Sequence, residues 1–323
     1  MSDAAFASGS VSLRLYPHNE LAGPAVVDEL RAQARLGEAA GFAGLMVSEH
    51  HGGFAGYLPN PLQTAGFLLA ATERMWVAPS PMLLPLRPVA LVAEEVAWLA
   101  AAYPGRVGLG VASGALPLDF TIVDLDVADA GARFKVALPR VIAMLRGEDL
   151  GDLAGDPALV RCATDPVPVL SAAVSPAAAR RAAGLGAGIL LDSMGALDHQ
   201  RRLTDEYHAA GGTAACVAIR RVWLGDPPTE ALAAQRALYE SYSSGAAQRH
   251  WAGTNTIVDT DPVALTERVA ESVRAAGCDT LNVRVHMDGL TPAAVRDQIT
   301  AVAPLTHCLG DRAASGAEDR PNT

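Results

Sequence analysis

The stretch GFAGLMVSEHH, residues 41–51, shows the pattern that decides the fold. A short apolar run, long enough for one buried strand, leads directly into the polar group Glu49-His50-His51. In folds that alternate strands and helices, sites form from residues at the carboxyl ends of the strands. The stretch therefore predicts a strand covered on both faces, with a polar edge at its carboxyl end.

The same alternation of a short apolar run and a longer amphipathic run continues along the whole chain, and it is typical of a parallel sheet wrapped in helices. The predicted strands cover residues 11–16, 44–48, 75–84, 106–112, 167–172, 188–192, 215–224 and 280–285. The length of 323 residues suits either two domains or one barrel. Because eight strand–helix pairs occur without a linker between them, we expect a single (β/α)8 TIM barrel, of class α/β.

Three segments are longer than an ordinary connection in such a barrel: residues 113–127, 147–166 and 226–261. The first and third follow strands 4 and 7, so we expect insertions at the active-site face, the third serving as a lid. The second follows a helix and is interpreted as an irregular surface excursion. We expect a barrel domain over residues 1–309 and a disordered tail over 310–323. The following aromatic and histidine residues could roof the pocket or pack a surface helix: Tyr239, Tyr242, His250 and Trp251.

Composition narrows the class of partner. The formal net charge is −10 and no basic cluster stands out, which argues against nucleic acid and anionic membrane surfaces as partners. The most apolar stretch, residues 75–93, contains four prolines and an arginine, so no membrane span is predicted. The four cysteines lack C-x-x-C spacing and are interpreted as reduced thiols of a cytoplasmic protein. We expect a small-molecule substrate.

Two chemical interpretations of Glu49-His50-His51 stand beside a structural one. Adjacent histidines at a strand end often only hydrogen-bond neighbouring loops. A shared metal ion is disfavoured, because successive strand residues point to opposite faces and no His-x-His occurs in the chain, and we predict no metal. One imidazole facing the barrel mouth beside a carboxylate would be an acid or base near neutral pH.

The third strand contains Pro79 and Pro81, which cannot donate to a sheet ladder. They predict a break in the strand, either as a simple bulge or as a kinked segment that presents backbone to a flat ligand. A cis Ser80–Pro81 bond would produce such a kink. In the fourth strand, the glycines from Gly108 to Gly114 do not open a helix, so we interpret them as permitting close approach to a ligand rather than as a dinucleotide fingerprint.

Ser175 and Pro176 follow the fifth strand and are favoured as the N-cap and first residue of a helix. The amides of that helix start could hold an anion at the barrel mouth. An ordinary capped helix is the alternative.

Taken together, residues 41–120 resemble the bacterial luciferase-like flavin monooxygenase family. The resemblance is weaker towards both ends of the chain, where position rather than residue identity matches. The matching elements, in family order, are G-F-x6-E-H-H, Asn60-Pro61, Leu84-Pro85, Ala93-Glu94-Glu95-Val96, Gly105-Arg106, Leu109-Gly110 and Asp119-Phe120.

The resemblance implies an enzyme that binds reduced FMN (FMNH2) and reacts with O2 through a C4a-peroxyflavin. It implies His50 as the acid or base, with Glu49 and His51 as neighbours. Ser80-Pro81 would lie against the flavin ring. The residues that it places near the phosphate or the strand ends are Ala112, Ser113, Ala172, Ala173 and Ser175. Ser113 stands where the family has an arginine near the phosphate, and alanines partly replace side-chain oxygens after the fifth strand. We therefore expect either weak FMN retention or a different flavin.

The expected reaction is oxygenation of a small, largely apolar carbonyl or aromatic compound, for example in secondary metabolism. No pyridine-nucleotide site is evident, so a separate flavin reductase would supply FMNH2. Two alternatives remain: an F420-dependent hydride-transfer oxidoreductase of the same superfamily, and a non-catalytic flavin-binding relative. The resemblance and the small residues of the predicted second helix, such as Ala65 and Gly66, indicate a homodimer.

Overall fold

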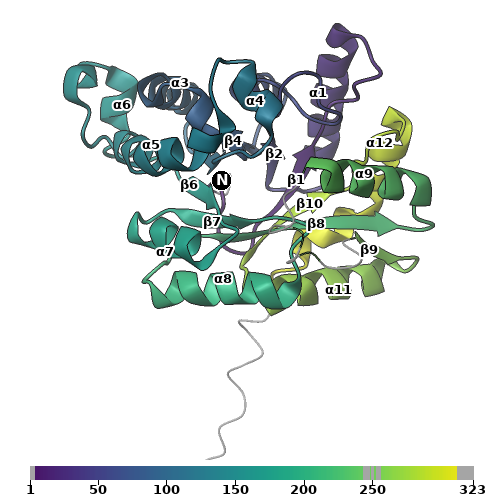
Figure 1. The fold of residues 1–323 in the computed structure, drawn as a ribbon. Coiled ribbons are helices and arrows are strands. Elements are labelled where there is room, and N and C mark those ends of the chain that lie inside the picture. The colour runs from purple at the N-terminus through teal and green to yellow at the C-terminus, as the bar shows by residue number, and fades with distance from the viewer. Residues whose placement is uncertain (1–3, 243–247, 249–250, 252–255, 311–323) are drawn as a thin grey trace, which may run out of the picture.

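The structure is a computed structural model, and it describes residues 4–242, 248, 251 and 256–310. Parallel strands lie at the centre and helices surround them (Figure 1). The strands are β1 (Val11–Leu15), β2 (Gly44–Val47), β3 (Trp76–Pro79), β4 (Met82–Leu83), β5 (Leu109–Ala112), β6 (Val169–Ala172), β7 (Gly188–Leu191), β8 (Cys216–Leu224), β9 (Thr256–Asp259) and β10 (Thr280–Arg284).

The helices follow the strands along the chain. They are α1 (Gly23–Ala39), α2 (Pro61–Leu69), α3 (Val89–Ala102), α4 (Pro117–Thr121), α5 (Ala130–Met144), α6 (Pro157–Arg161), α7 (Pro176–Gly184), α8 (Leu197–Ala209), α9 (Thr229–Tyr242), α11 (Pro262–Ala275) and α12 (Pro292–Ala301). Four 3₁₀ turns accompany them: η1 (Leu84–Leu86), η2 (Val127–Asp129), η3 (Gly151–Leu153) and η4 (Ala303–His307).

The strand order is β3-β2-β1-β10-β8-β7-β6-β5-β4, with every pair parallel. Because β3 and β4 are consecutive parts of one chain segment, the two ends of this order meet and the sheet nearly closes. The fold is the β/α barrel that the sequence predicts, and all eight predicted strands are present. The third is divided into β3 and β4 at Ser80-Pro81, whose peptide bond is cis, as expected.

All three long segments contain regular structure. Residues 113–127 contain α4, and 226–261 contain α9 and a further strand, β9, paired with the end of β8. The segment 147–166, expected to be irregular, includes α6, which begins at the N-cap Asp156 and packs on α3. Except for Gly310, the predicted tail lies outside the described residues.

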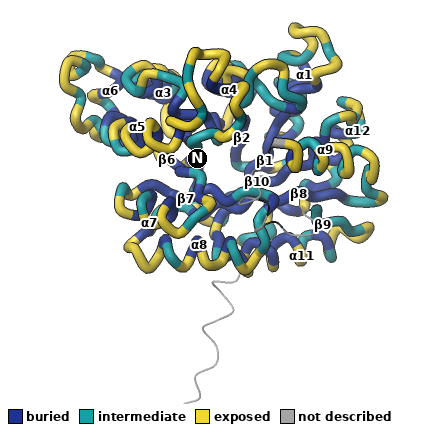
Figure 2. The backbone as a smooth tube through the Cα atoms, in the orientation of Figure 1, coloured by how far each residue is buried: buried dark blue, intermediate teal, exposed yellow. Residues whose placement is uncertain are grey.

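Two apolar clusters form the core. The larger one fills the space between strands and helices, which is why the strands are dark in Figure 2 while the helices are exposed on their outer sides. A smaller cluster lies inside the barrel and includes Phe6, Trp76, Leu170 and Ile219. Phe6 meets the ring of Trp76 edge-on, with the ring centroids 5.0 Å apart. This cluster fills one part of the interior, so the barrel is not an open pore.

The glycines of the fourth predicted strand have a different use from the one expected. A Cβ at Gly108 would lie 2.6 Å from a ring carbon of Phe6, and one at Gly110 would lie 2.6 Å from the Cβ of Ser80. The interpretation that these two glycines make room for a ligand is therefore wrong. They make room for the protein's own Phe6 and Ser80.

No described helix is long and apolar enough to cross a membrane. All four cysteines are free thiols; Cys162, Cys216 and Cys278 are buried, and Cys308 is half-buried. Burial raises the pKa of the Cys278 thiol to about 12 and that of Cys308 to about 11, so both are unreactive near neutral pH.

Candidate active site

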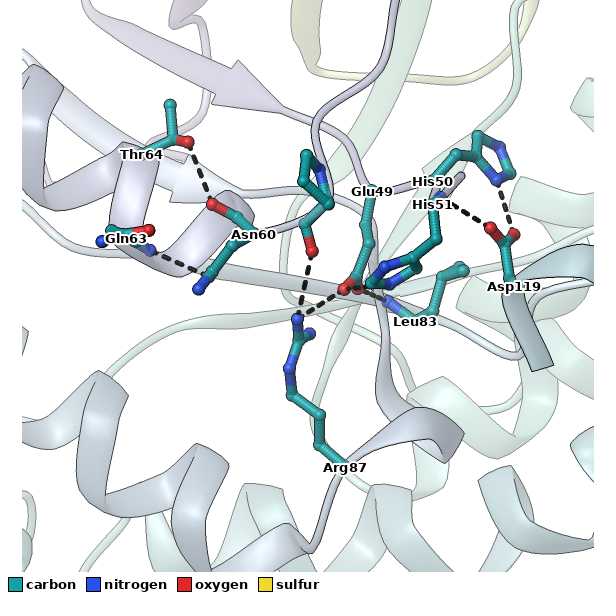
Figure 3. Close-up of polar contacts among 10 residues, drawn as sticks. Glu49, His50, His51, Asn60, Gln63, Thr64, Leu83, Arg87 and Asp119 are labelled. Carbon is teal, nitrogen blue, oxygen red and sulfur yellow. Dashed lines mark hydrogen bonds and ion pairs between the residues drawn. The ribbon is translucent and has the colours of Figure 1, made fainter. Parts of the chain in front are cut away.

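His50 and Asp119 form a pair at the carboxyl ends of the strands. Asp119, fully buried in α4, places Oδ2 2.7 Å from His50 Nδ1, and its Oδ1 accepts the backbone N–H of His51 at 2.8 Å. Figure 3 shows both contacts. Since a carboxylate only accepts hydrogen bonds, the His50 proton facing it is assigned to Nδ1. The chemically variable nitrogen of His50 is therefore Nε2.

Glu49 points to a different set of partners. Its buried carboxylate accepts the Leu83 backbone N–H at 2.6 Å and pairs with Arg87 Nη2 at 2.6 Å. His51 Nε2 lies 3.1 Å from the same carboxylate (Figure 3). The two adjacent histidines thus serve separate carboxylates, as the alternation of side chains along an extended segment predicts. Glu49 and His51 thus share one set of contacts, whereas the His50 ring contacts Asp119.

Aromatic rings enclose the His50 imidazole. The ring centroids of Phe54 and Tyr57 lie 4.8 Å and 4.5 Å from it, and 16% of the His50 side chain is exposed. Tyr57 is linked to α9, because its hydroxyl lies 2.8 Å from that of Tyr239. The two rings therefore shield part of the imidazole from water.

A buried arginine supports the bend in the third strand. Arg14 of β1 donates from Nη1 to the Ser80 carbonyl at 2.8 Å and from Nε to Asn282 Oδ1 at 2.6 Å, and it also contacts the Ser48 hydroxyl. The amide of Glu49 donates to the Pro81 carbonyl at 3.1 Å. The loop that carries His50 and the Ser80-Pro81 bend are thereby held together across neighbouring strands.

The residues that the resemblance places near a flavin phosphate lie at the ends of β5 and β6. Ala112 ends β5 and Ser113 follows it, with the Ser113 hydroxyl 3.4 Å from the Gly114 carbonyl. Ala172 ends β6, and the amide of Ala173 already donates to the Leu190 carbonyl at 3.1 Å.

Helix α7 begins as the sequence predicts. Ser175 is its N-cap, and the Ser175 hydroxyl accepts the Ala178 N–H at 3.3 Å. Proline follows at the first helical position, where no N–H is needed. Whether an anion binds at this helix start stays a prediction.

The structure describes only part of the segment predicted to form a lid, residues 226–261. Tyr239 of α9 is buried and reaches the barrel mouth, where Arg284 Nη1 donates to its hydroxyl at 2.7 Å. The backbone of Trp251 forms an isolated β-bridge with Gly195. No contact between Trp251 and Tyr239 or Arg284 is found among the described residues. The side chain of Tyr242 and all of His250 lie outside the described residues.

Within the part of the chain that the structure describes, no three His, Cys, Asp or Glu residues are grouped so as to hold a metal ion.

Comparison with known proteins identifies the family. The model of the luciferase-like monooxygenase family matches residues 9–306.

The chain belongs to the luciferase-like monooxygenase family. A curated relative, the F420-dependent glucose-6-phosphate dehydrogenase of Beutenbergia cavernae, is 34% identical over 181 residues, which is 51% of this chain and 52% of that protein. The match thus spans only about half of the dehydrogenase.

Solved structures of other proteins share the fold. The oxygenating constituent of 3,6-diketocamphane monooxygenase from the CAM plasmid of Pseudomonas putida, in complex with FMN, is 18% identical, with a TM-score of 0.72. The comparison covers 93% of this chain and 98% of that one. An F420-dependent secondary alcohol dehydrogenase, in complex with an F420-acetone adduct, is 18% identical, with a TM-score of 0.69 over 94% of this chain and all of that one. The fold therefore accommodates either cofactor.

Sequence reasoning missed several residues of the site. Asp119 appears in the matching pattern but has no assigned role there, and Arg87 has no role at all. Tyr57 lies in a loop without a motif. Spacing along the chain gives no signal for these contacts, because Asp119 is 69 residues from His50.

Proposed function

We propose that this luciferase-like protein is a flavin-dependent monooxygenase, which uses reduced FMN and O2 to oxygenate a small carbonyl or aromatic compound. The observation that carries the proposal is the His50–Asp119 pair, at 2.7 Å, near the carboxyl ends of the barrel strands. A non-catalytic relative has no need of a buried carboxylate that fixes one histidine tautomer.

The residues present fit a flavin at the third strand. Ser80, next to the bend, has a buried hydroxyl without a hydrogen-bond partner among the described residues, so a donor remains for a ligand's polar edge. Ser80 and Pro81 would contact the ring, and Ser113 and Ser175, with nearby backbone amides, would hold the phosphate. When bound, the reduced flavin supplies the electrons for oxygen activation.

His50 would move a proton at Nε2 while Asp119 keeps Nδ1 protonated and holds the ring in place. Phe54 and Tyr57 would keep water away from this ring, which protects reactive species from hydrolysis. Tyr239 would add a cover from α9. Glu49 would position the loop through Arg87 and Leu83 rather than take part in proton transfer.

An F420-dependent hydride transfer is the second candidate, because the 34% identical curated relative is named for that cofactor. Oxygen uptake separates the two functions. The monooxygenase predicts rapid O2 consumption and oxygenated product with reduced FMN and a carbonyl panel. A protein that ignores FMN but oxidises alcohols while reducing F420 anaerobically would refute it in favour of the alternative.

We also propose a homodimer through α2 and α3. Leu91 and Trp98 of α3 are each 53% exposed, which is unusual for large apolar side chains on one helix. A separate reductase would supply the reduced flavin, and the four free thiols fit a cytoplasmic location.

A further inference from the structure

Two arginines stand side by side on neighbouring strands inside the barrel mouth. Arg221 of β8 and Arg284 of β10 are partners in the parallel register, and their exposed fractions are 4% and 3%. Along β8, Val217 and Ile219 belong to the cluster inside the barrel, so Arg221 lies on the same inward face. Two guanidinium groups are thus buried next to each other.

The adjacent Arg220 shows how a buried arginine is normally satisfied. It lies on the outer face of β8, where its Nε donates to the Ser272 hydroxyl and its Nη2 to the Ser272 carbonyl, each at 3.0 Å. Arg221 has no hydrogen bond to any described residue, and its Nε is buried without a partner. Its guanidinium carbon lies 5.0 Å from the centroid of the Tyr239 ring.

Two of the three guanidinium nitrogens of Arg284 have a hydrogen-bond partner. Its Nη1 donates to the Tyr239 hydroxyl at 2.7 Å and its Nε to the His286 carbonyl at 3.0 Å, but its Nη2 is buried without a partner. Its guanidinium carbon lies 4.1 Å from the centroid of the Tyr16 ring. Among the described residues, neither Arg221 nor Arg284 is paired with a carboxylate, in contrast to Arg87 with Glu49.

The local electrostatics follow from this arrangement. Burial lowers the pKa of Arg221, and the charge of Arg284 lowers it further. Burial alone would raise the pKa of Tyr239, but the charges of Arg284 and Arg221 outweigh it and lower that pKa. Placing two like charges out of water is costly unless an opposite charge and hydrogen-bond acceptors compensate them. No described carboxylate pairs with either arginine. The neighbouring tyrosines raise the pKa of Arg284, but Arg221 Nε and Arg284 Nη2 still have no acceptor among the described residues.

We propose that Arg221 and Arg284 together bind an oxyanion on the substrate, a carboxylate or a phosphate. The inference rests on the proposed function and deepens it: the small carbonyl or aromatic substrate carries an acidic group. Guanidinium groups suit this role because their planar array of donors matches two oxygens of a carboxylate or phosphate. Tyr239 covers the pair from α9 and must shift to admit the anion.

The position of the pair favours the substrate over the flavin phosphate as the source of the anion. In the strand order, β10 is four places from β5 and β8 is two places from β6, in a barrel of eight positions. The residues expected to hold the flavin phosphate, such as Ser113 and Ser175, follow β5 and β6. An anion at Arg284 therefore lies across the mouth from them.

Binding of small probes tests the proposal without turnover. Calorimetry would compare benzoate and phenyl phosphate with benzamide, a neutral molecule close to benzoate in shape. The wild-type protein is expected to bind at least one of the two anions about tenfold or more tightly than benzamide, the usual effect of a charge-assisted hydrogen bond. The preferred anion then identifies the acidic group as carboxylate or phosphate. Equal binding of both anions and benzamide would overturn the proposal.

Variants locate the probe site. Arg221→Met is expected to remove the preference for the anion, whereas Arg221→Lys keeps part of it. Arg220→Met is the matched control, since it removes the neighbouring guanidinium from the opposite face of β8. If Arg220→Met and Arg221→Met lose the preference for the anion over benzamide equally, the assignment is refuted.

A titration with FMN distinguishes the remaining possibility. If Arg221→Met weakens FMN binding and leaves anion binding unchanged, the pair belongs to the cofactor site and the inference is wrong. Unchanged FMN affinity with lost anion preference supports it. The outcome is separate from the oxygen-uptake test, which decides the proposed function on its own.

Discussion

Replacing Asp119 with Asn changes the charge at the site while keeping the shape of the side chain. Asp119 is fully buried and uses both oxygens: one accepts from His50 Nδ1 and the other from the His51 amide. Asparagine has only one acceptor oxygen. If that oxygen keeps the His51 amide, the asparagine NH2 faces His50 Nδ1, which must then accept, and the imidazole proton moves to Nε2.

The magnitude follows from the hydrogen bond that is lost. A buried, charge-assisted hydrogen bond is worth about 1.5–3 kcal/mol, or roughly 10- to 150-fold in rate when it acts in the transition state. We therefore expect Asp119→Asn to lower product formation by roughly 10- to 150-fold. His50→Ala is expected to lower it by roughly 100-fold or more, the range of a general acid or base.

Two assays check this reasoning. Turnover of a carbonyl panel with reduced FMN gives the rates, and nitrogen NMR of labelled histidine reports which ring nitrogen of His50 carries the proton. In a His50→Ala background, Asp119→Asn should change turnover little, because Asp119 acts through His50. Multiplicative losses in the double variant, or an unchanged His50 tautomer in Asp119→Asn, would refute the account of the pair.

Three further predictions concern stability. Arg87→Met should destabilise the protein by about 3 kcal/mol in urea unfolding, because it removes the arginine partner of the buried Glu49 carboxylate. Adding Glu49→Gln should restore part of the loss, and a neutral single variant would contradict this. Gly110→Ala should lower the free energy of unfolding by about 1–3 kcal/mol, because the new Cβ overlaps the Ser80 side chain. Gly66→Ala in α2 is the control: its Cβ would lie 3.7 Å from Leu99, so the change should be neutral or stabilising. Equal effects of the two substitutions would show that the contact with Ser80 is unimportant. Glu38→Gln should cost roughly 1 kcal/mol at neutral pH in the same measurement, with a difference that disappears in acid.

The acid dependence at Glu38 follows from its pKa. Burial would raise the pKa of Glu38, but backbone N–H donors from Arg74, Glu73 and Met75 outweigh burial and lower it. Because the pKa is lower in the folded state, the carboxylate contributes stability above its unfolded pKa and loses it as pH falls through the folded value. A wild-type to Glu38→Gln difference that persists unchanged in strong acid would contradict this assignment.

The barrel could be predicted from the sequence because its strands are short, apolar and regularly spaced. The fine structure could not. The third strand divides where Pro79 and Pro81 interrupt the ladder, which composition indicates, but β9 lies in an insertion with no strand periodicity of its own. The glycines were misinterpreted because the sequence does not show that Phe6 and Ser80 occupy the adjacent space.

The site could be predicted only in part, for a similar physical reason. His50 is recognisable at a strand end, whereas Asp119 becomes its partner only through tertiary contact. Arg221 and Arg284 do carry a signal in the sequence, because both lie in strands expected to be buried in a barrel, where a charge is expensive unless it is paired or has a function.

A crystal structure of the protein with FMN is the most direct test of the central claim, that the barrel mouth beside His50 binds a flavin. The account predicts the ring in contact with Ser80 and Pro81, and His50 Nε2 facing the ligand while Nδ1 stays on Asp119. A flavin bound elsewhere, or a His50 ring turned away from it towards bulk solvent, would contradict the account.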